Sequence, residues 1–288
     1  MKSSALDLPS VQGKISVYVP WTFNSGGWYR GFVPRLTYSI NNDCFNRSMI
    51  MYSADVVEGA DPIVGIKEDK TTKVMQNLSG SIRFYGALPV ANSAAYPRWG
   101  GGIEAGAYSP ISYGKYMSPL GYAYAYGYFP GFTRSQGLKV TGFYQMKLDR
   151  SCYFCPSMAN TMPRGFEQAS SLPSAIASIS PWTAKMSLDY AIPVNIGEWP
   201  IFNSFIYINQ LVLTPHFDCS FFKGGSLFSA GLSVTFNLET LVWIEWPCSI
   251  GVTASYNGSL NGSFNAISAV TGLQLSRFHI GPIFSVSF

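Results

Sequence analysis

The C-terminal stretch Phe278-His279-Ile280-Gly281-Pro282-Ile283-Phe284-Ser285-Val286-Ser287-Phe288 decides the fold. Every second residue from Phe278 onward is apolar, and the residues between them are small or polar except Ile283. A side-chain period of two is the period of a β-strand, so this segment presents one apolar face and one polar face. Pro282 has no backbone N–H, and it therefore predicts either a missing ladder hydrogen bond or a bulge.

The same alternation recurs upstream, at residues 78–88, 183–192, 230–239 and 250–257. Its polar positions include four charged side chains: Arg83, Lys185, Asp189 and Glu239. Charges are costly in the dry core of a soluble β-sandwich, which is the alternative fold. In the lumen of a membrane barrel they can meet water or one another. The pattern therefore favours a transmembrane barrel.

The composition agrees with this reading. Charged residues make up 12% of the 288 residues, against about 25% in an average soluble domain, and aromatic residues make up 16%. No stretch reaches the ~18 consecutive apolar residues that a transmembrane helix requires. The net charge of +4 is spread without a basic run, so nucleic acid is not an expected partner.

We expect an all-β protein, an antiparallel up-and-down transmembrane β-barrel with about twelve strands, or ten or fourteen if a hairpin is split or missed. The expected strands are 14–24, 32–41, 48–57, 76–89, 100–110, 122–130, 137–148, 183–194, 203–221, 228–239, 248–258 and 277–288. Segment 203–221 is long and switches its alternation, which predicts a bulge.

Barrels of this kind have even strand numbers, short periplasmic turns and both termini in the periplasm. Residues 14–288 are then the barrel and residues 1–13 a periplasmic linker. The three longest connections, 58–75, 149–182 and 259–276, fall outside the cell. We expect loop 149–182, rich in Ser, Pro and Met, to fold over or into the barrel.

Two stretches carry a family resemblance. One is Tyr96-Pro97-Arg98-Trp99-Gly100-Gly101-Gly102, and the other runs from Tyr128-Phe129-Pro130-Gly131 to Gly142-Phe143-Tyr144-Gln145. They resemble the C-terminal barrel of large outer-membrane proteins of the Bacteroidota. In those proteins a soluble β-propeller precedes a barrel distantly like that of the outer-membrane assembly proteins. The resemblance implies a Gram-negative outer-membrane location and a role in envelope complexes, but no reaction.

The C-terminal strand carries a separate signal. A terminal aromatic residue preceded by apolar residues in phase resembles the signal read by the barrel-assembly machinery, and Ile280, Phe284, Val286 and Phe288 match it. An exposed apolar edge strand can pair with a template strand by β-augmentation. The alternative is that the sequence simply ends inside a strand.

Three functions follow as hypotheses. The first is a membrane anchor or interaction subunit of an envelope complex, in contact with outer-membrane lipid and lipopolysaccharide. The second is a passive or selective pore with a charged lumen. Its expected lining residues are Arg83, Lys139, Lys147, Lys185, Asp189, Glu239 and His279. The third, and least favoured, is a lipid hydrolase using His216, Asp218 and Ser220, which share one face of a strand.

No cofactor or metal is expected, and the chain is not expected to be an enzyme. The two histidines and the scattered carboxylates have no metal-ligand spacing. Cys152 and Cys155 form a CxxC motif in an expected external loop, where they are either a local disulfide or two free thiols.

Overall fold

The computed structural model describes residues 12–41, 49–52, 64–67, 75–90, 94–111, 118–149, 161–166, 176, 180–201, 206–241, 248–260 and 275–286. Its named elements are all strands. They are β1 (Gln12–Tyr18), β2 (Trp21–Thr22), β3 (Tyr29–Asn41), β4 (Met49–Tyr52), β5 (Val64–Lys67), β6 (Met75–Ala87), β7 (Gly100–Pro110), β8 (Leu120–Pro130), β9 (Gly137–Lys147), β10 (Trp182–Ile201), β11 (Ile206–Phe222), β12 (Gly225–Leu241), β13 (Cys248–Gly258) and β14 (Phe278–Val286).

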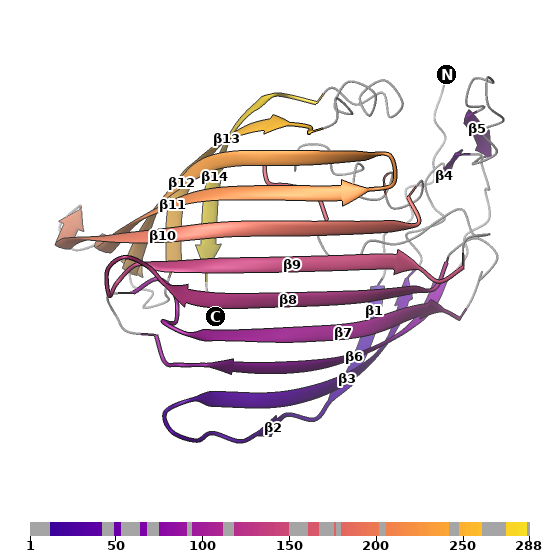
Figure 1. The fold of residues 1–288 in the computed structure, drawn as a ribbon, viewed down its shortest axis with the longest axis horizontal. Helices are drawn as coiled ribbons and strands as arrows, with labels where there is room; N and C mark the ends of the chain where they lie inside the picture. The colour runs from indigo at the N-terminus through magenta and orange to yellow at the C-terminus, as the bar shows by residue number, and fades with distance from the viewer. Residues whose placement is uncertain are drawn as a thin grey trace.

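Twelve of these strands form one sheet, which confirms the expected all-β class and the antiparallel up-and-down order. The order is β1-β3-β6-β7-β8-β9-β10-β11-β12-β13-β14, with β2 pairing β3 beside that path. Figure 1 shows that the sheet curls, so that β1 and β14 pass behind the central strands. Within the described residues, the two edge strands β1 and β14 are not hydrogen-bonded to each other.

The expected strand 14–24 corresponds to β1 and β2 together. Both pair with β3, and the chain between them keeps a hydrogen bond from Val19 N to Pro34 O at 3.2 Å. The hairpin closes at Gly26 and Gly27, whose φ angles are 60° and 78°. Only glycine adopts such angles at little cost, so the turn is encoded locally.

The expected strand 48–57 is not part of the sheet, and this prediction was wrong. Residues 49–52 form β4, which pairs with β5 inside the expected external loop 58–75. β3 pairs directly with β6 instead. The sequence of β4 is Met-Ile-Met-Tyr, with no polar alternate position, so it lacks the two-faced pattern that a place in this sheet requires.

The loss of that strand changes where the ends lie. Ten antiparallel steps separate β1 from β14, so these two strands run in the same direction. The first residue of β1 therefore lies at one rim of the sheet and the last residue of β14 at the other. This differs from the expected arrangement, in which both ends share a rim.

The connections leave the sheet at its two rims. The three longest, 42–74, 148–181 and 259–277, leave from the same rim as the start of β1. We call it the long-loop rim, and it lies to the right in Figure 1. The short-turn rim carries the connections 23–28, 88–99, 131–136, 202–205 and 242–247. The long-loop rim also carries the shorter connections 111–119 and 223–224, so the expected sorting holds for the three longest connections.

The two predicted irregularities have different outcomes. The register between β11 and β12 shifts between Tyr207 and Gln210, which confirms a bulge in segment 203–221. Pro282 pairs with Val252 without a register shift, so it leaves a ladder bond unmade rather than creating a bulge.

Candidate functional site

The two faces of the curled sheet differ sharply in polarity. On the outer face, Ile103 and Val252 are 53% and 51% exposed. On the inner face, Asp218 and Asn257 are 0% and 1% exposed. Strand side chains alternate between faces, so the sheet turns an apolar surface outward and encloses polar groups. A soluble protein has the opposite arrangement.

Residues 161–166, which we call the plug segment, lie against this polar inner face. The backbone N–H of Arg164 donates to Asp218 Oδ2 at 2.9 Å, and its Nε donates to the same oxygen at 2.8 Å. Its Nη2 donates to Asp218 Oδ1 at 2.8 Å and also to Asp189. One arginine therefore joins carboxylates of β10 and β11.

Three strands also bind backbone carbonyls of the plug segment. Lys185 Nζ donates to Met162 O at 2.7 Å, and Asn257 Nδ2 donates to Gly165 O at 3.0 Å. Ser220 Oγ donates to Thr161 O. Each of these groups is polar and directed inward, so the plug segment supplies acceptors that the strand side chains would otherwise lack.

An apolar cluster packs around the same segment. Met162 and Phe166 from the plug segment lie with Ile176, Phe222 and Leu227 in one buried cluster. The plug segment is therefore held both by hydrogen bonds to the strands and by apolar packing.

Gly165 is required for this close approach. Its φ is +89°, and a Cβ at this position would lie 2.5 Å from Asn257 Oδ1 and 2.5 Å from Ser255 Oγ. Both the backbone angle and the lack of space exclude a larger residue.

The charge of Arg164 is held in place by its partners. Burial by itself lowers the pKa of the guanidinium, but the hydrogen bonds to Asp218 and Asp189 and their negative charges outweigh burial and raise the pKa. Arg164 therefore stays cationic, and removing Asp218 would leave Asp189 as its remaining carboxylate partner among the described residues.

A second feature occupies β8, where Tyr122, Tyr124, Tyr126 and Tyr128 alternate along the inner face. The ring centroids of Tyr124 and Tyr126 are 5.8 Å apart, and those of Tyr126 and Tyr128 are 5.6 Å apart. Tyr96 continues the row, with its ring centroid 5.6 Å from that of Tyr128. We call the four residues of β8 the tyrosine column.

Charged side chains hold the column's hydroxyl groups. Arg83 Nη2 donates to the Tyr126 hydroxyl at 3.2 Å, and the Tyr122 hydroxyl donates to Glu104 Oε1 at 3.0 Å. The Arg83 guanidinium also lies 5.7 Å from the ring centroids of Tyr85 and Tyr126. Opposite charges therefore flank one aromatic row.

The structure places most of the expected lumen residues on the inner face. Lys139, Asp189 and His279 lie in one row across the strands: Tyr128-Lys139-Asp189-His216-Gly231-Ser255-His279. Arg83 and Lys185 lie in a parallel row: Arg83-Glu104-Tyr124-Phe143-Lys185-Ser220. Lys147 is buried near the long-loop rim at 8% exposure.

Other expected residues are described in part or not at all. Ile280 and Phe284 lie on the outer face, 73% and 65% exposed. Val286 ends β14. The side chain of Glu239 and residues Cys152, Cys155 and Phe288 lie outside the described part of the chain.

The sequence patterns missed Arg164 and the tyrosine column. Arg164 lies between strands, where no alternation marks a residue as inward-facing. The column was visible as Tyr122-Ala123-Tyr124-Ala125-Tyr126-Gly127-Tyr128, an alternation of aromatic and small residues on one strand. Its neighbours Ala123 and Gly127 leave the outer face of β8 smooth.

His216, Asp218 and Ser220 do share the inner face, but their contacts differ from those of a catalytic triad. Asp218 binds Arg164, and Ser220 donates to Thr161 O. His216 Nδ1 lies 3.5 Å from Ser233 Oγ. A triad needs a base hydrogen-bonded to both its nucleophile and its carboxylate, and these contacts provide neither bond.

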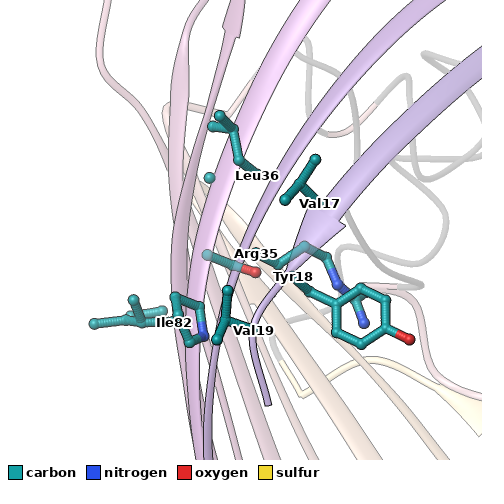
Figure 2. Close-up of a pocket in the computed structure, with 10 residues that line it drawn as sticks. Val17, Tyr18, Val19, Arg35, Leu36 and Ile82 are labelled. Carbon is teal, nitrogen blue, oxygen red and sulfur yellow. The ribbon is translucent and has the colours of Figure 1, made fainter. Parts of the chain in front are cut away.

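An apolar hollow of about 430 Å³ lies at the edge of the sheet, along the adjacent strands β1, β3 and β6. Figure 2 shows it, with Ile82 on one side and the ring of Tyr18 beside Arg35 on the other. The Arg35 guanidinium lies 5.8 Å from the Tyr18 ring centroid. The hollow's walls are mainly aliphatic, with Gly80 and Ala105 among them.

No family model matches this chain, and neither a curated protein nor a solved structure matches it significantly. Among the described residues there is no helix long and apolar enough to span a membrane. The described residues also contain no group of three or more His, Cys, Asp or Glu placed to hold a metal ion.

Proposed function

We propose that this chain is an integral outer-membrane β-barrel that acts as an anchor or interaction subunit of an envelope complex. The observation that carries the proposal is the inverted polarity of the sheet, with half-exposed aliphatic residues outside and buried polar residues inside. Lipid would cover the outer face. The expected partners are outer-membrane lipid and lipopolysaccharide, and the barrel-assembly machinery during insertion.

Two further observations favour an anchor over an open channel. The plug segment occupies the interior beside β10, β11 and β13, held by Arg164 and by buried apolar contacts. The longest connections gather at one rim, where they offer a contact surface for a partner. The family resemblance of Tyr96–Gly102 and Tyr128–Gln145 points to the same role.

A paired substitution tests membrane insertion. Val252→Arg places a charge on the outer face, and in lipid it is expected to cost about 2–4 kcal/mol of folding free energy near the bilayer midplane. The same change at a half-exposed site of a soluble protein would stay within about 0.5 kcal/mol. Unfolding in lipid vesicles measures the difference, with Lys223→Arg, at the exposed β11–β12 turn, as the control.

The complex itself is tested by cross-linking in intact cells, followed by mild detergent extraction. The chain is expected to migrate in a larger assembly that contains other envelope proteins. Extraction only as a lone barrel, with no cross-linked partner, would count against the anchor role while leaving membrane insertion standing.

A selective pore is the second candidate, because the inner wall of β6 to β9 carries Arg83, Glu104 and Lys139 away from the contacts of the plug segment. Conductance across planar bilayers decides it. The pore hypothesis expects current when residues 152–176 are deleted, since the plug segment is then gone. No current from that deletion variant, once its insertion is verified, would refute it.

A further inference from the structure

Membrane anchoring does not require the tyrosine column. An anchor needs apolar side chains on the outer face, whereas these four rings lie on the inner face and are half-buried. The hydroxyls of Tyr126 and Tyr122 are hydrogen-bonded to the charged side chains of Arg83 and Glu104.

The rings are seated against glycine backbone. A Cβ on Gly102 would lie 2.8 Å from the Tyr126 ring, and a Cβ on Gly106 would lie 2.7 Å from the Tyr122 ring. These two rings therefore cover the backbone of β7 with one face. Both rings are only half-buried, so part of their surface is open to the interior.

Donors and acceptors border this aromatic surface. Lys139 Nζ lies 5.9 Å from the Tyr96 ring centroid at the short-turn end. Toward β1, a cavity of about 210 Å³ is lined by polar and aromatic groups that include Arg35, Arg83 and Glu104. Pockets that enclose a drug-sized ligand have volumes of about 300–1,000 Å³. This cavity is smaller, so it has room for a single unit of a polymeric ligand.

We propose that the tyrosine column and its charged border bind a carbohydrate chain. A sugar ring has an apolar C–H face, whose partial positive charge is attracted to the negative face of an aromatic ring. Its rim of hydroxyls both donates and accepts, so it can bond Arg83 and Glu104 at the same time. An anionic ligand would meet the negative charge of Glu104, and an apolar ligand would form no hydrogen bond with either residue.

The geometry suits a linear ligand. Alternate residues of a strand repeat about every 6.8 Å, so four tyrosines offer successive stacking positions along β8. The ligand would be a free oligosaccharide or the polysaccharide of lipopolysaccharide, which share this chemistry. The inference concerns the inner face and does not require that the chain act as an anchor.

Calorimetric titration of the purified full chain in detergent tests the proposal. The probes are maltohexaose and, in a separate arm, delipidated lipopolysaccharide polysaccharide. Binding of at least one probe is expected. Tyr124→Ala and Tyr126→Ala should each weaken it about tenfold or more, which is the scale of losing one aromatic stack. Tyr124→Phe should retain most of the affinity, because it keeps the ring.

Tyr144→Ala is the matched control, since Tyr144 lies on the outer face of neighbouring β9 and is 42% exposed. It should leave the affinity unchanged. Each variant is first checked for the heat-modifiable gel mobility of a folded barrel. Failure of wild type to bind either probe, or equal losses from Tyr124→Ala and Tyr144→Ala, would overturn the proposal. Retained membrane extraction of Tyr124→Ala would show that the proposed anchor is unaffected.

Discussion

At the scale of single residues, the ion pair of Arg164 governs the interior. Asp218 is fully buried and receives three hydrogen bonds from Arg164, one of them from the backbone. Asp218→Ala should lower the free energy of unfolding by about 3–5 kcal/mol, because it leaves a partly buried guanidinium with only Asp189 to compensate it among the described residues. Urea unfolding in detergent measures this loss.

The double variant Arg164→Met, Asp218→Ala should recover part of that loss, since it also removes the guanidinium that has lost Asp218. The recovery is partial because Asp189 then loses its bond to Arg164. Arg134→Ala, in the exposed 131–136 turn, is the control and should change stability by at most about 0.5 kcal/mol. Additive losses in the double variant would mean that the ion pair does not stabilise the plug segment.

Gly165 gives a second prediction at this scale. Gly165→Ala combines a left-handed φ of +89° with a contact of 2.5 Å to Asn257, so it should destabilise the fold by about 1–3 kcal/mol. Gly142→Ala is the matched control, because nothing lies within 4 Å of its Cβ position and its φ is not left-handed. It should be neutral or slightly stabilising. Thermal unfolding of the two variants compares them, and equal midpoints would contradict the prediction.

The residues that could be predicted are those on regular strands. Alternation alone fixes the face of a strand residue, so the sequence predicts Lys139, Asp189 and Lys185 on the inner face. Arg164 could not be placed, because its position depends on a connection folding back over three strands. No local pattern encodes such a long-range contact.

At the scale of elements, β14 carries a testable signal. Ile280 and Phe284 project from the outer face of an edge strand, 73% and 65% exposed. Replacing either with Ser should slow assembly into the membrane several-fold, because the apolar row offered to a template strand is interrupted. The fraction with heat-modifiable mobility is followed over time after synthesis.

Ser285→Ala on the same strand is the control, because Ser285 faces inward beside Ser249. It should assemble at the wild-type rate. Equal assembly half-times for Phe284→Ser and Ser285→Ala would show that the outer row of β14 is not recognised.

The success of prediction at this scale followed the strength of alternation. The expected strand 248–258 coincides with β13, where apolar and small polar residues alternate throughout. The prediction that segment 48–57 belongs to the sheet was wrong. Met49–Tyr52 is continuously apolar, so its sequence indicates neither an inward-facing side nor a partner strand. The tyrosine column was encoded on β8, but its chemistry depends on Arg83 and Glu104 from two other strands.

At the scale of the whole molecule, the direction of the edge strands constrains the orientation. Because β1 and β14 are parallel, the start of β1 and the end of β14 lie at opposite rims of the sheet. In the proposed membrane-inserted state, the rule that long connections face outward places the end of β14 on the periplasmic side. The expected periplasmic position of the start of β1 conflicts with this orientation.

Epitope insertion tests this orientation. One tag is inserted at Lys223-Gly224, the β11–β12 turn at the long-loop rim, and another at Thr133-Arg134 at the short-turn rim. Both sites are exposed turns, so neither insertion disturbs a ladder. Antibody should label intact cells only through the 223–224 tag, and should reach the 133–134 tag only after the outer membrane is permeabilised. Labelling of intact cells through the 133–134 tag alone would reverse the orientation and place the end of β14 outside.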